Sequence, residues 1–309
     1  MKKFSIRKIS AGFLFLILVT LIAGFSLSAN AEEYIVPAES HSRQKRSLLD
    51  PEDRRQEVAD TTEAPFASIG RIISPASKPG YISLGTGFVV GTNTIVTNNH
   101  VAESFKNAKV LNPNAKDDAW FYPGRDGSAT PFGKFKVIDV AFSPNADIAV
   151  VTVDKQNDRP DGPELGEILT PFVLKKFESS DTHVTISGYP GEKNHTQWSH
   201  ENDLFTSNFT DLENPLLFYD IDTTGGQSGS PIYNDQFEVV GVHSNGGIKQ
   251  TGNHGQRLNE VNYNFIVNRV NEEENKRFIR CASSVKNHKN TRNFQNHGKS
   301  RVFLFFKIV

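Results

Sequence analysis

The feature that most constrains the fold is a series of short apolar and β-branched runs, separated by turn residues, that begins at Phe66. Such a series is typical of an all-β barrel or sandwich. The segment 87–97 predicts a strand, a turn and a second strand. Further strands are predicted at residues 136–140, 148–153, 183–188, 216–221, 237–243 and 262–267. An amphipathic helix pattern follows at residues 265–278, so we expect an all-β domain with a short C-terminal helix.

The N-terminal residues 1–31 are predicted to be a secretory signal peptide. Basic residues precede an apolar run at 11–25, and small residues at 29–31 suit cleavage. A retained membrane anchor is the alternative, but the run of about fifteen residues is shorter than the roughly 20 that span a bilayer. We therefore expect a secreted, extracellular protein with no membrane attachment after the signal is removed.

Residues 32–47 are predicted to be a propeptide. The segment is charged and poor in apolar side chains, and it ends in a basic cluster at 42–46. Cleavage after Arg46, or directly before Leu48, would release the following domain. We expect another protease to make this cut, and an unprocessed solvated segment is the alternative.

Charge and cysteine content limit the partners. The chain has 34 Lys and Arg against 35 Asp and Glu, but nine of the basic residues lie in 276–309, which contains no Asp or Glu. The remainder is acidic, which argues against nucleic acid as a partner. Cys281 is the single cysteine, so no intramolecular disulfide can form. The tail 276–309 lacks apolar periodicity and is expected to be disordered, as a translated frameshift would be; a surface-binding basic tail is the alternative.

Three segments carry candidate catalytic residues. The stretch 222–231, DTTGGQSGSP, surrounds Ser228 with glycines, which cost about 0.5–1 kcal/mol relative to Ala in a helix or strand. His100 follows one apolar run, and Asp147 opens another, where an unpaired carboxylate would be costly. A serine needs a base to become a nucleophile, and a buried Asp orients that base, so the order His, Asp, Ser predicts a catalytic triad. The backbone N–H groups of Gly226 and Ser228 are the predicted oxyanion hole.

Other chemistries lack their motifs. Ser228 is not in a Gly-x-Ser-x-Gly elbow, because position 230 is Ser. The sequence contains no His-Glu-x-x-His, no phosphate-binding Gly-x-x-x-x-Gly-Lys and no His pattern beside Cys281. We therefore expect neither a metal nor a cofactor.

The motifs at 97–100, 223–231 and 241–243 resemble those of the chymotrypsin-fold serine proteases of Gram-positive bacteria. The resemblance is strongest to the secreted glutamyl endopeptidases of staphylococci and enterococci, with the staphylococcal exfoliative toxins as more distant relatives. Up to about Lys276 the precursor is similar to the enterococcal glutamyl endopeptidase. A non-catalytic, surface-binding member of the same fold is the alternative from another functional class.

The resemblance implies a chymotrypsin-like double β-barrel. The protease domain would span 48–275, with six-stranded barrels at about 60–160 and 165–265 and the triad in the cleft between them. It also implies a monomeric serine endopeptidase that acts on proteins or peptides through an acyl-enzyme.

Specificity is predicted from three residues. Thr223 and His243 match positions that bind the substrate carboxylate in the glutamyl family, and both can donate hydrogen bonds to an anion. Asp222 matches the position that binds Arg or Lys in trypsin-like relatives, so specificity for basic residues is the alternative. We expect cleavage after Glu, more weakly after Asp, and an Asp222 side chain that points away from the pocket.

Activation is expected to differ from that of the animal enzymes. There the new N-terminal amine pairs with an Asp directly before the nucleophile, whereas here that residue is Gln227. The resemblance implies that the new α-amine lies near the specificity pocket, where it would help to bind the substrate carboxylate.

Overall fold

The computed structural model describes residues 48–158, 161–247 and 251–292. For the last helix, side chains are described as far as Arg280. The predicted signal peptide and propeptide at 1–47, and the tail at 293–309, lie outside the described residues. Among the helices that are described, none is long and apolar enough to cross a membrane.

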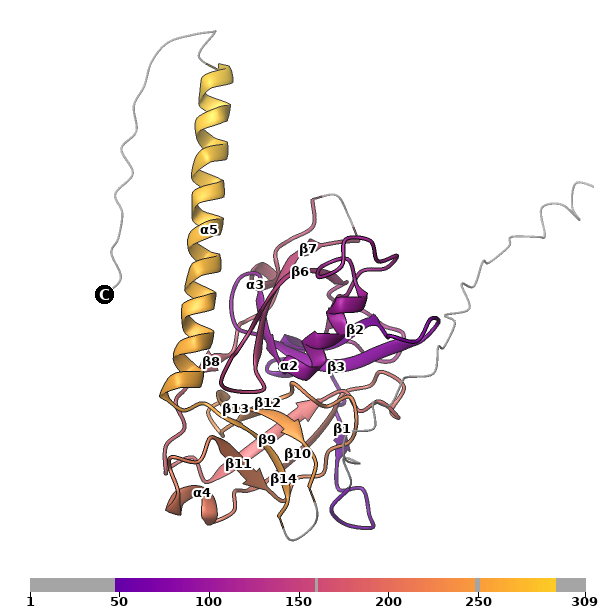
Figure 1. The fold of residues 1–309 in the computed structure, drawn as a ribbon, viewed down its shortest axis with the longest axis vertical. Coiled ribbons are helices and arrows are strands. Elements are labelled where there is room, and N and C mark those ends of the chain that lie inside the picture. Colours follow the sequence, from indigo (N-terminus) through magenta and orange to yellow (C-terminus); the bar gives the residue numbers. More distant parts are fainter. Residues whose placement is uncertain (1–47, 159–160, 248–250, 293–309) are drawn as a thin grey trace, which may run out of the picture. The chain divides into compact units, whose positions relative to one another are not determined.

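Six strands close into an antiparallel barrel in the order β2-β3-β4-β7-β6-β5 (Figure 1). They are β2 (Ile69–Pro75), β3 (Ile82–Val89), β4 (Thr94–Thr97), β5 (Trp120–Pro123), β6 (Phe135–Phe142) and β7 (Ala149–Gln156). Strand β7 illustrates how an apolar run in the sequence predicts a buried strand. Val151 and Val153 fill the barrel, whereas Val150 faces the second sheet, so both faces of the strand are apolar.

The second half of the domain is an eight-stranded sheet with the path β1-β10-β9-β12-β13-β14-β11, in which β8 pairs with β13. The strands are β1 (Gln56–Glu57), β8 (Val173–Leu174), β9 (His183–Gly188), β10 (Trp198–Asp203), β11 (Leu216–Tyr219), β12 (Pro231–Tyr233), β13 (Glu238–Asn245) and β14 (Asn253–Arg257). A bridge between Leu204 and Tyr219 links the end of β10 to β11. The double-barrel prediction is confirmed, but the second barrel is less regular than six closed strands because β1 and β8 are added to it.

Short helical turns connect the strands. They are η1 (Phe66–Ser68), α2 (Asn99–Ala102), η2 (Glu103–Asn107), α3 (Leu165–Ile168) and α4 (Ser207–Thr210). A buried cluster that includes Phe88, Tyr189 and Val242 packs the two halves against each other. The segments that carry His100 and Asp147 belong to the first barrel, and Ser228 lies on the loop between β11 and β12 of the second sheet.

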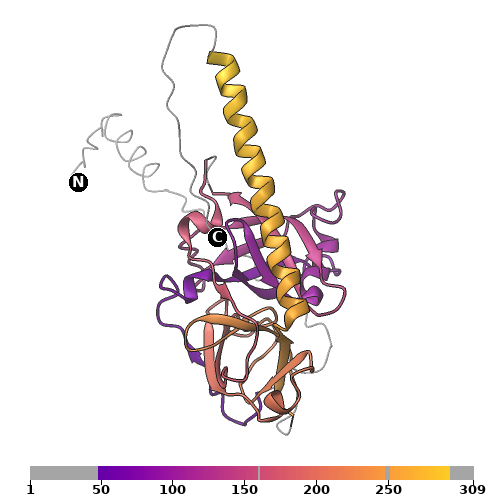
Figure 2. The same cartoon turned by 90° about the vertical axis from the view of Figure 1, so that its left-hand side faces the viewer.

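The C-terminal helix is longer than the sequence analysis predicts. Helix α5 runs over Glu260–Arg292, 33 residues, so the predicted C-terminal helix is confirmed, but its predicted length is wrong. In Figures 1 and 2 it continues past the strands. The helix contains neither Pro nor Gly, so nothing in this segment interrupts it once it has begun.

The strand predicted at 262–267 is also wrong, because these residues form the second turn of α5. Asn259 starts the helix: its Oδ1 accepts the backbone N–H of Asn262 at 3.0 Å, which is an N-cap. Ile266, buried in the core between the two halves, lies four residues after Asn262 on the same helical face. Asn262 and Ile266 are both buried, so burial in this segment follows helical rather than strand spacing.

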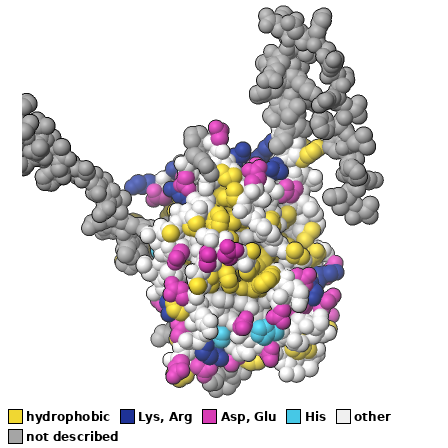
Figure 3. Space-filling model, turned by 180° about the vertical axis from the view of Figure 1, so that it is seen from behind, with side chains coloured by type: hydrophobic (Ala, Val, Ile, Leu, Met, Phe, Trp, Pro, Cys, Tyr) yellow, Lys and Arg dark blue, Asp and Glu magenta, His cyan; other side chains and the backbone are white. Residues whose placement is uncertain are grey.

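Surface charge is mixed. On the face shown in Figure 3, Lys and Arg side chains lie scattered among Asp and Glu. Such a distribution is typical of a solvated surface.

Candidate active site

His100 is positioned by two asparagines that precede it. It lies in α2, directly after β4. Asn98 Nδ2 donates to the backbone oxygen of Asp147 at 2.8 Å. Asn99 Nδ2 donates to the backbone oxygens of Ser143 and Ala146 at 2.8 and 2.9 Å. The Asn-Asn-His sequence therefore ties the histidine segment to the loop that carries the aspartate.

Asp147 accepts hydrogen bonds on both carboxylate oxygens. Oδ1 accepts the backbone N–H of His100 at 3.0 Å, and Oδ2 lies 2.6 Å from His100 Nδ1. Ser244 Oγ also donates to Oδ2, at 2.6 Å. Although burial alone would raise the pKa of Asp147, the hydrogen bonds and charge of His100, together with the Ser244 hydroxyl, lower that pKa to about 2. The carboxylate is therefore ionised at neutral pH and holds the imidazole with its Nδ1 proton toward Asp147.

Ser228 completes the chain of polar contacts. Its Oγ lies 2.8 Å from His100 Nε2, the ring nitrogen opposite the one that faces Asp147. With the Nδ1 proton directed to the carboxylate, the lone pair of Nε2 faces the serine hydroxyl and can accept its proton. The structure thus brings all three sequence-predicted catalytic residues together across the two halves of the domain.

Ser244 was missed by the sequence analysis. It directly follows the Gly241-Val-His243 motif on β13, and its side chain is buried. Besides the bond to Asp147, its backbone oxygen lies 3.4 Å from Ser228 Oγ. A hydroxyl after a motif gives little signal in sequence, because its role depends on a contact with a residue 97 positions away.

The predicted oxyanion donors are arranged by a glycine turn. Gly226 has φ +99°, and a Cβ there would lie 2.6 Å from the Tyr189 backbone oxygen, so only glycine fits. The oxygen of Gly225 accepts the N–H of Gly191 at 2.6 Å. Because C=O and N–H point oppositely in a trans peptide, the Gly226 N–H is directed away from Gly191. Among the described residues, the N–H groups of Gly226 and Ser228 have no acceptor.

The two predicted specificity residues are both fully buried. Thr223 lies in the loop before Ser228, and its Oγ1 has no hydrogen-bond partner among the described residues. His243 lies on β13, and its Nδ1 is 2.6 Å from the hydroxyl of Tyr219. Burial raises the pKa of Tyr219, so this hydroxyl keeps its proton and can donate it to Nδ1.

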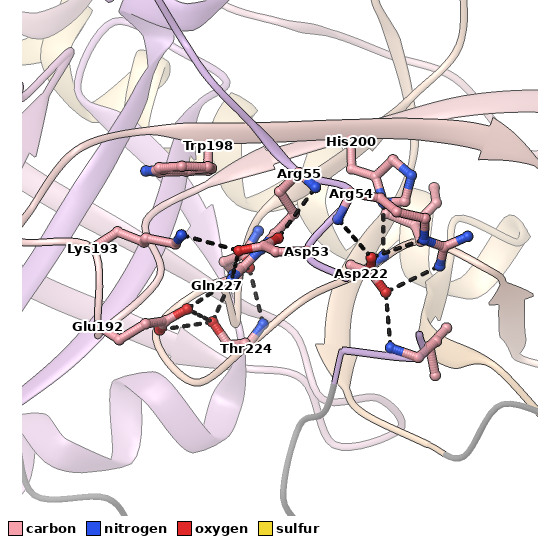
Figure 4. A network of polar contacts seen from close by, with 12 residues as sticks. Asp53, Arg54, Arg55, Glu192, Lys193, Trp198, His200, Asp222, Thr224 and Gln227 are labelled. Atoms are coloured by element: carbon pink, nitrogen blue, oxygen red, sulfur yellow. Dashed lines mark hydrogen bonds and ion pairs between the residues drawn. The ribbon is translucent and has the colours of Figure 1, made fainter. Parts of the chain in front are cut away.

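Asp222 points to the N-terminal segment (Figure 4). Its Oδ1 accepts the backbone N–H of Leu49 at 2.8 Å and Arg54 Nη2 at 3.0 Å. Its Oδ2 accepts Arg54 Nε at 2.9 Å and the Arg54 backbone N–H at 3.1 Å. Burial would raise the pKa of Asp222, but these bonds lower it. Both oxygens are occupied by protein donors, which removes the basis for a pocket specific for Arg or Lys.

In the described part of the chain, no group of three or more His, Cys, Asp or Glu residues is placed to hold a metal ion.

Comparison with known proteins agrees with this geometry. The profile of the trypsin-like peptidase domain matches residues 85–242, just over half of the chain. A glutamyl endopeptidase of Staphylococcus aureus (strain MRSA252) is 27% identical over 234 residues, which cover 74% of this chain and 61% of that protein. A glutamyl endopeptidase of Staphylococcus epidermidis is 29% identical over 240 residues, which cover 75% of this chain and 77% of that protein. The chain thus spans less than two thirds of the first relative.

Solved structures share the fold. A Glu endopeptidase in complex with MPD superimposes with a TM-score of 0.57 at 24% identity, covering 72% of this chain and 99% of that one. The protease Anisep from Arthrobacter nicotinovorans gives a TM-score of 0.50 at 17% identity, covering 67% and 94%.

The chain belongs to the trypsin-like peptidase family. Its resemblance to the glutamyl endopeptidases, drawn from the motifs, is confirmed by the staphylococcal relatives.

Proposed function

We propose that this protein is a secreted serine endopeptidase that cleaves peptide bonds after Glu, and more weakly after Asp. The observation that carries the proposal is the continuous chain from Asp147 through His100 to Ser228, with contacts of 2.6 and 2.8 Å. The sequence match to glutamyl endopeptidases supports the choice of substrate.

In the proposed mechanism, His100 Nε2 takes the proton of Ser228 Oγ as the oxygen attacks the scissile carbonyl. Asp147 remains ionised and stabilises the imidazolium. The N–H groups of Gly226 and Ser228 donate to the developing oxyanion, an interaction that contributes about 10²–10³ in rate per donor. His100 then gives its proton to the leaving amine. In the second half of the reaction a water molecule gives a proton to His100 Nε2 as it attacks the acyl-enzyme, and His100 returns that proton to Ser228 Oγ.

Glu specificity is proposed to rest on Thr223 and His243. The hydroxyl of Thr223 is a buried polar group without a protein partner among the described residues, and such a group is costly unless a ligand binds it. When Tyr219 donates to His243 Nδ1, a neutral imidazole carries its proton on Nε2, where it is a donor. The Thr223 hydroxyl and the His243 Nε2–H can each donate a hydrogen bond to the carboxylate of a Glu side chain.

We also propose that the protein acts as a monomer after an activating protease removes 32–47. Cleavage before Leu48 would place a new α-amine one residue from the Leu49 amide that bonds Asp222, next to Thr223 in the chain. The amine is proposed to help bind the substrate carboxylate. Extending the mature N-terminus by a few residues should therefore reduce turnover of Glu substrates; unchanged turnover would contradict this part of the proposal.

Two experiments test the proposed function. A fluorophosphonate should label processed wild-type protein but not the Ser228→Ala variant, and a failure to label would favour a binding protein. Peptides that vary only in the residue before the scissile bond, as Glu, Asp, Lys or Phe, should be cleaved in the order Glu, Asp, then the others. A preference for Lys would contradict the proposed pocket.

A further inference from the structure

A segment that lies before the first barrel contacts the nucleophile loop of the second half. We call residues 49–57 the N-terminal strap and residues 222–228 the nucleophile loop. The strap ends in β1, whose Gln56 pairs with Ser199 of β10. Just beyond it, the N–H of Val58 donates to the Gln197 oxygen at 2.9 Å. The strap therefore ends in the outermost strand at one edge of the second sheet.

Arg54 fastens the strap at the beginning of the nucleophile loop. Its guanidinium bonds Asp222, as described above, and also Asp220 through Nη2 at 2.8 Å. The backbone N–H of Asp222 donates to His200 Nδ1 at 2.8 Å. This anchor fixes the start of the loop but does not reach Ser228.

Arg55 reaches further into the same loop (Figure 4). Its side chain is 1% exposed. Nη1 donates to Thr224 Oγ1 at 2.7 Å and to Gln227 Oε1 at 2.8 Å. Nη2 donates to Glu192 Oε1 at 2.8 Å, and Nε donates to Asp53 Oδ1 at 2.8 Å. One guanidinium thus joins the strap, the nucleophile loop and the segment that carries Glu192.

Gln227 is the residue directly before the nucleophile. Its Oε1 also accepts the backbone N–H of Thr224 at 2.9 Å, so the side chain folds back across the loop. Its backbone oxygen accepts the N–H and the hydroxyl of Ser230 at 3.0 and 2.7 Å. Gln227 is therefore fixed from both sides, and it lies between Gly226 and Ser228, the two residues whose N–H groups are the predicted oxyanion donors.

Arg55 is held in its fork geometry by acidic partners. Although burial would lower its pKa, hydrogen bonds to Asp53 and Glu192 raise it, so the side chain keeps its charge. Lys193 contacts Asp53 at 3.0 Å and lies over the ring of Trp198 at 3.7 Å. A planar guanidinium presents five donors in a fixed fork, a geometry that the ammonium group of a lysine does not reproduce.

We propose that Arg55 is a positioning residue of the oxyanion hole, acting through Gln227 and Thr224. Its cationic side chain, which comes from the strap, contacts Gln227, the residue directly before Ser228. This inference rests on the proposed function, because its readout is turnover of a Glu peptide.

The test compares Arg55→Ala with Arg257→Ala. Arg257 is an equally buried arginine that bonds the backbone oxygens of Leu212 and Asn208, away from the nucleophile loop. Turnover of a Glu peptide is measured per fluorophosphonate-labelled site, together with the thermal unfolding midpoint. We expect kcat of Arg55→Ala to fall by roughly 10²-fold with KM changed less than about threefold, because a misplaced oxyanion donor acts on the transition state. Arg257→Ala should lower the unfolding midpoint and leave kcat per labelled site unchanged.

Rescue separates a positioning role from a structural one. Added guanidinium should restore part of the kcat of Arg55→Ala and none of that of Gln227→Met, which lacks the acceptor. If kcat per labelled site in Arg55→Ala equals that of the wild type, Arg55 only stabilises the fold and the inference is wrong. If Arg55→Ala does not fold, kcat per labelled site is measured for Arg55→Lys and Gln227→Met instead. A reduced kcat supports the positioning role, and an unchanged kcat contradicts it. Absence of Glu-peptide turnover in the wild type would instead overturn the proposed function.

Discussion

The two halves of the domain support their catalytic groups in different ways. The first is a closed barrel, and it holds His100 and Asp147 with side chains of its own, Asn98 and Asn99. The second sheet is not closed along its strand path, and its nucleophile loop is bonded by the strap that precedes the first barrel. The histidine and aspartate are therefore held mainly by contacts within the first barrel, with one further bond from Ser244 of the second sheet, whereas the loop of Ser228 is bonded by the distant strap.

This difference suggests where regulation can act. A change at the N-terminus reaches the nucleophile loop through Leu49, Arg54 and Arg55. Substitutions of the residues that hold His100 and Asp147 should impair proton transfer from Ser228. Substitutions in the strap should instead shift the N–H groups of the oxyanion hole.

The largest effect is expected for Asp147→Asn in the first half. Replacing the carboxylate reverses the favoured tautomer of His100, and kcat should fall by about 10⁴-fold. Asp139→Asn, at an exposed position on β6, is the matched control and should leave kcat unchanged. Steady-state kinetics on a Glu peptide measure both, and a loss of less than tenfold in Asp147→Asn would contradict the assigned role.

A smaller loss is expected for Gly226→Ala in the second half. The added Cβ would meet the Tyr189 oxygen at 2.6 Å and the Gly191 nitrogen at 2.8 Å, so the loop must shift. We expect kcat to fall by about 10²–10³-fold, the cost of one oxyanion donor. Gly80→Ala is the control, because Gly80 also has a positive φ, of +81°, but nothing within 4 Å of the new Cβ. Equal kcat in the two variants would argue against Gly226 as a donor.

Asp222→Asn tests the strap by its effect on stability. Loss of the buried charge opposite Arg54 should reduce the free energy of unfolding by about 3 kcal/mol at pH 7. The folded pKa of Asp222 is lowered, so the carboxylate contributes stability above the unfolded value of about 3.9, and that contribution is lost as the pH falls through the folded pKa. Urea titrations should therefore show the wild-type advantage shrinking below about pH 4.

Asp220→Asn is the control for that titration. Asp220 bonds the same guanidinium, but its side chain is 31% exposed. Asp220→Asn should lower the free energy of unfolding at pH 7 by less than Asp222→Asn does. An advantage of the wild type over Asp222→Asn that grows on acidification would contradict the assigned anchor.

The smallest effect is expected for Ser244→Ala. This variant removes one hydroxyl donor from Asp147 and leaves both bonds from His100 in place. We expect kcat/KM to fall about tenfold, since a hydrogen bond to a charged group contributes roughly 1.5–3 kcal/mol. Ser74→Ala, a buried serine that bonds Ser104 in the first barrel, should leave kcat/KM unchanged.

Much of the fold and of the candidate site could be predicted from the sequence, because both rely on local patterns. A run of apolar, β-branched residues marks buried strands such as β7, and glycines with one serine mark the nucleophile loop. Helix α5 was predicted too short because the apolar periodicity that marks it in the sequence ends near Phe278. The N-cap at Asn259, and a segment without Pro or Gly, are the signals that would have extended it.

The strap could not be predicted, because its contacts have no local signature. Arg55 and Gln227 are 172 positions apart, and Leu49 and Asp222 are 173 apart. A basic pair in a charged N-terminal segment reads as solvated surface until the fold places it beside the nucleophile loop. Ser244 was overlooked for a similar reason, because its partner Asp147 lies 97 positions away, whereas His243 was found through the family resemblance.

The central claim is that the Asp222 carboxylate holds the strap and does not itself bind the substrate side chain. The most direct test is the ratio of kcat/KM for a Glu peptide to that for the matched Lys peptide, in the wild type and in Asp222→Asn. We predict that the wild type prefers Glu and that the ratio does not rise in the variant, although the variant is less stable. A wild type that prefers Lys, or a ratio that rises toward Glu when the carboxylate is removed, would contradict the account.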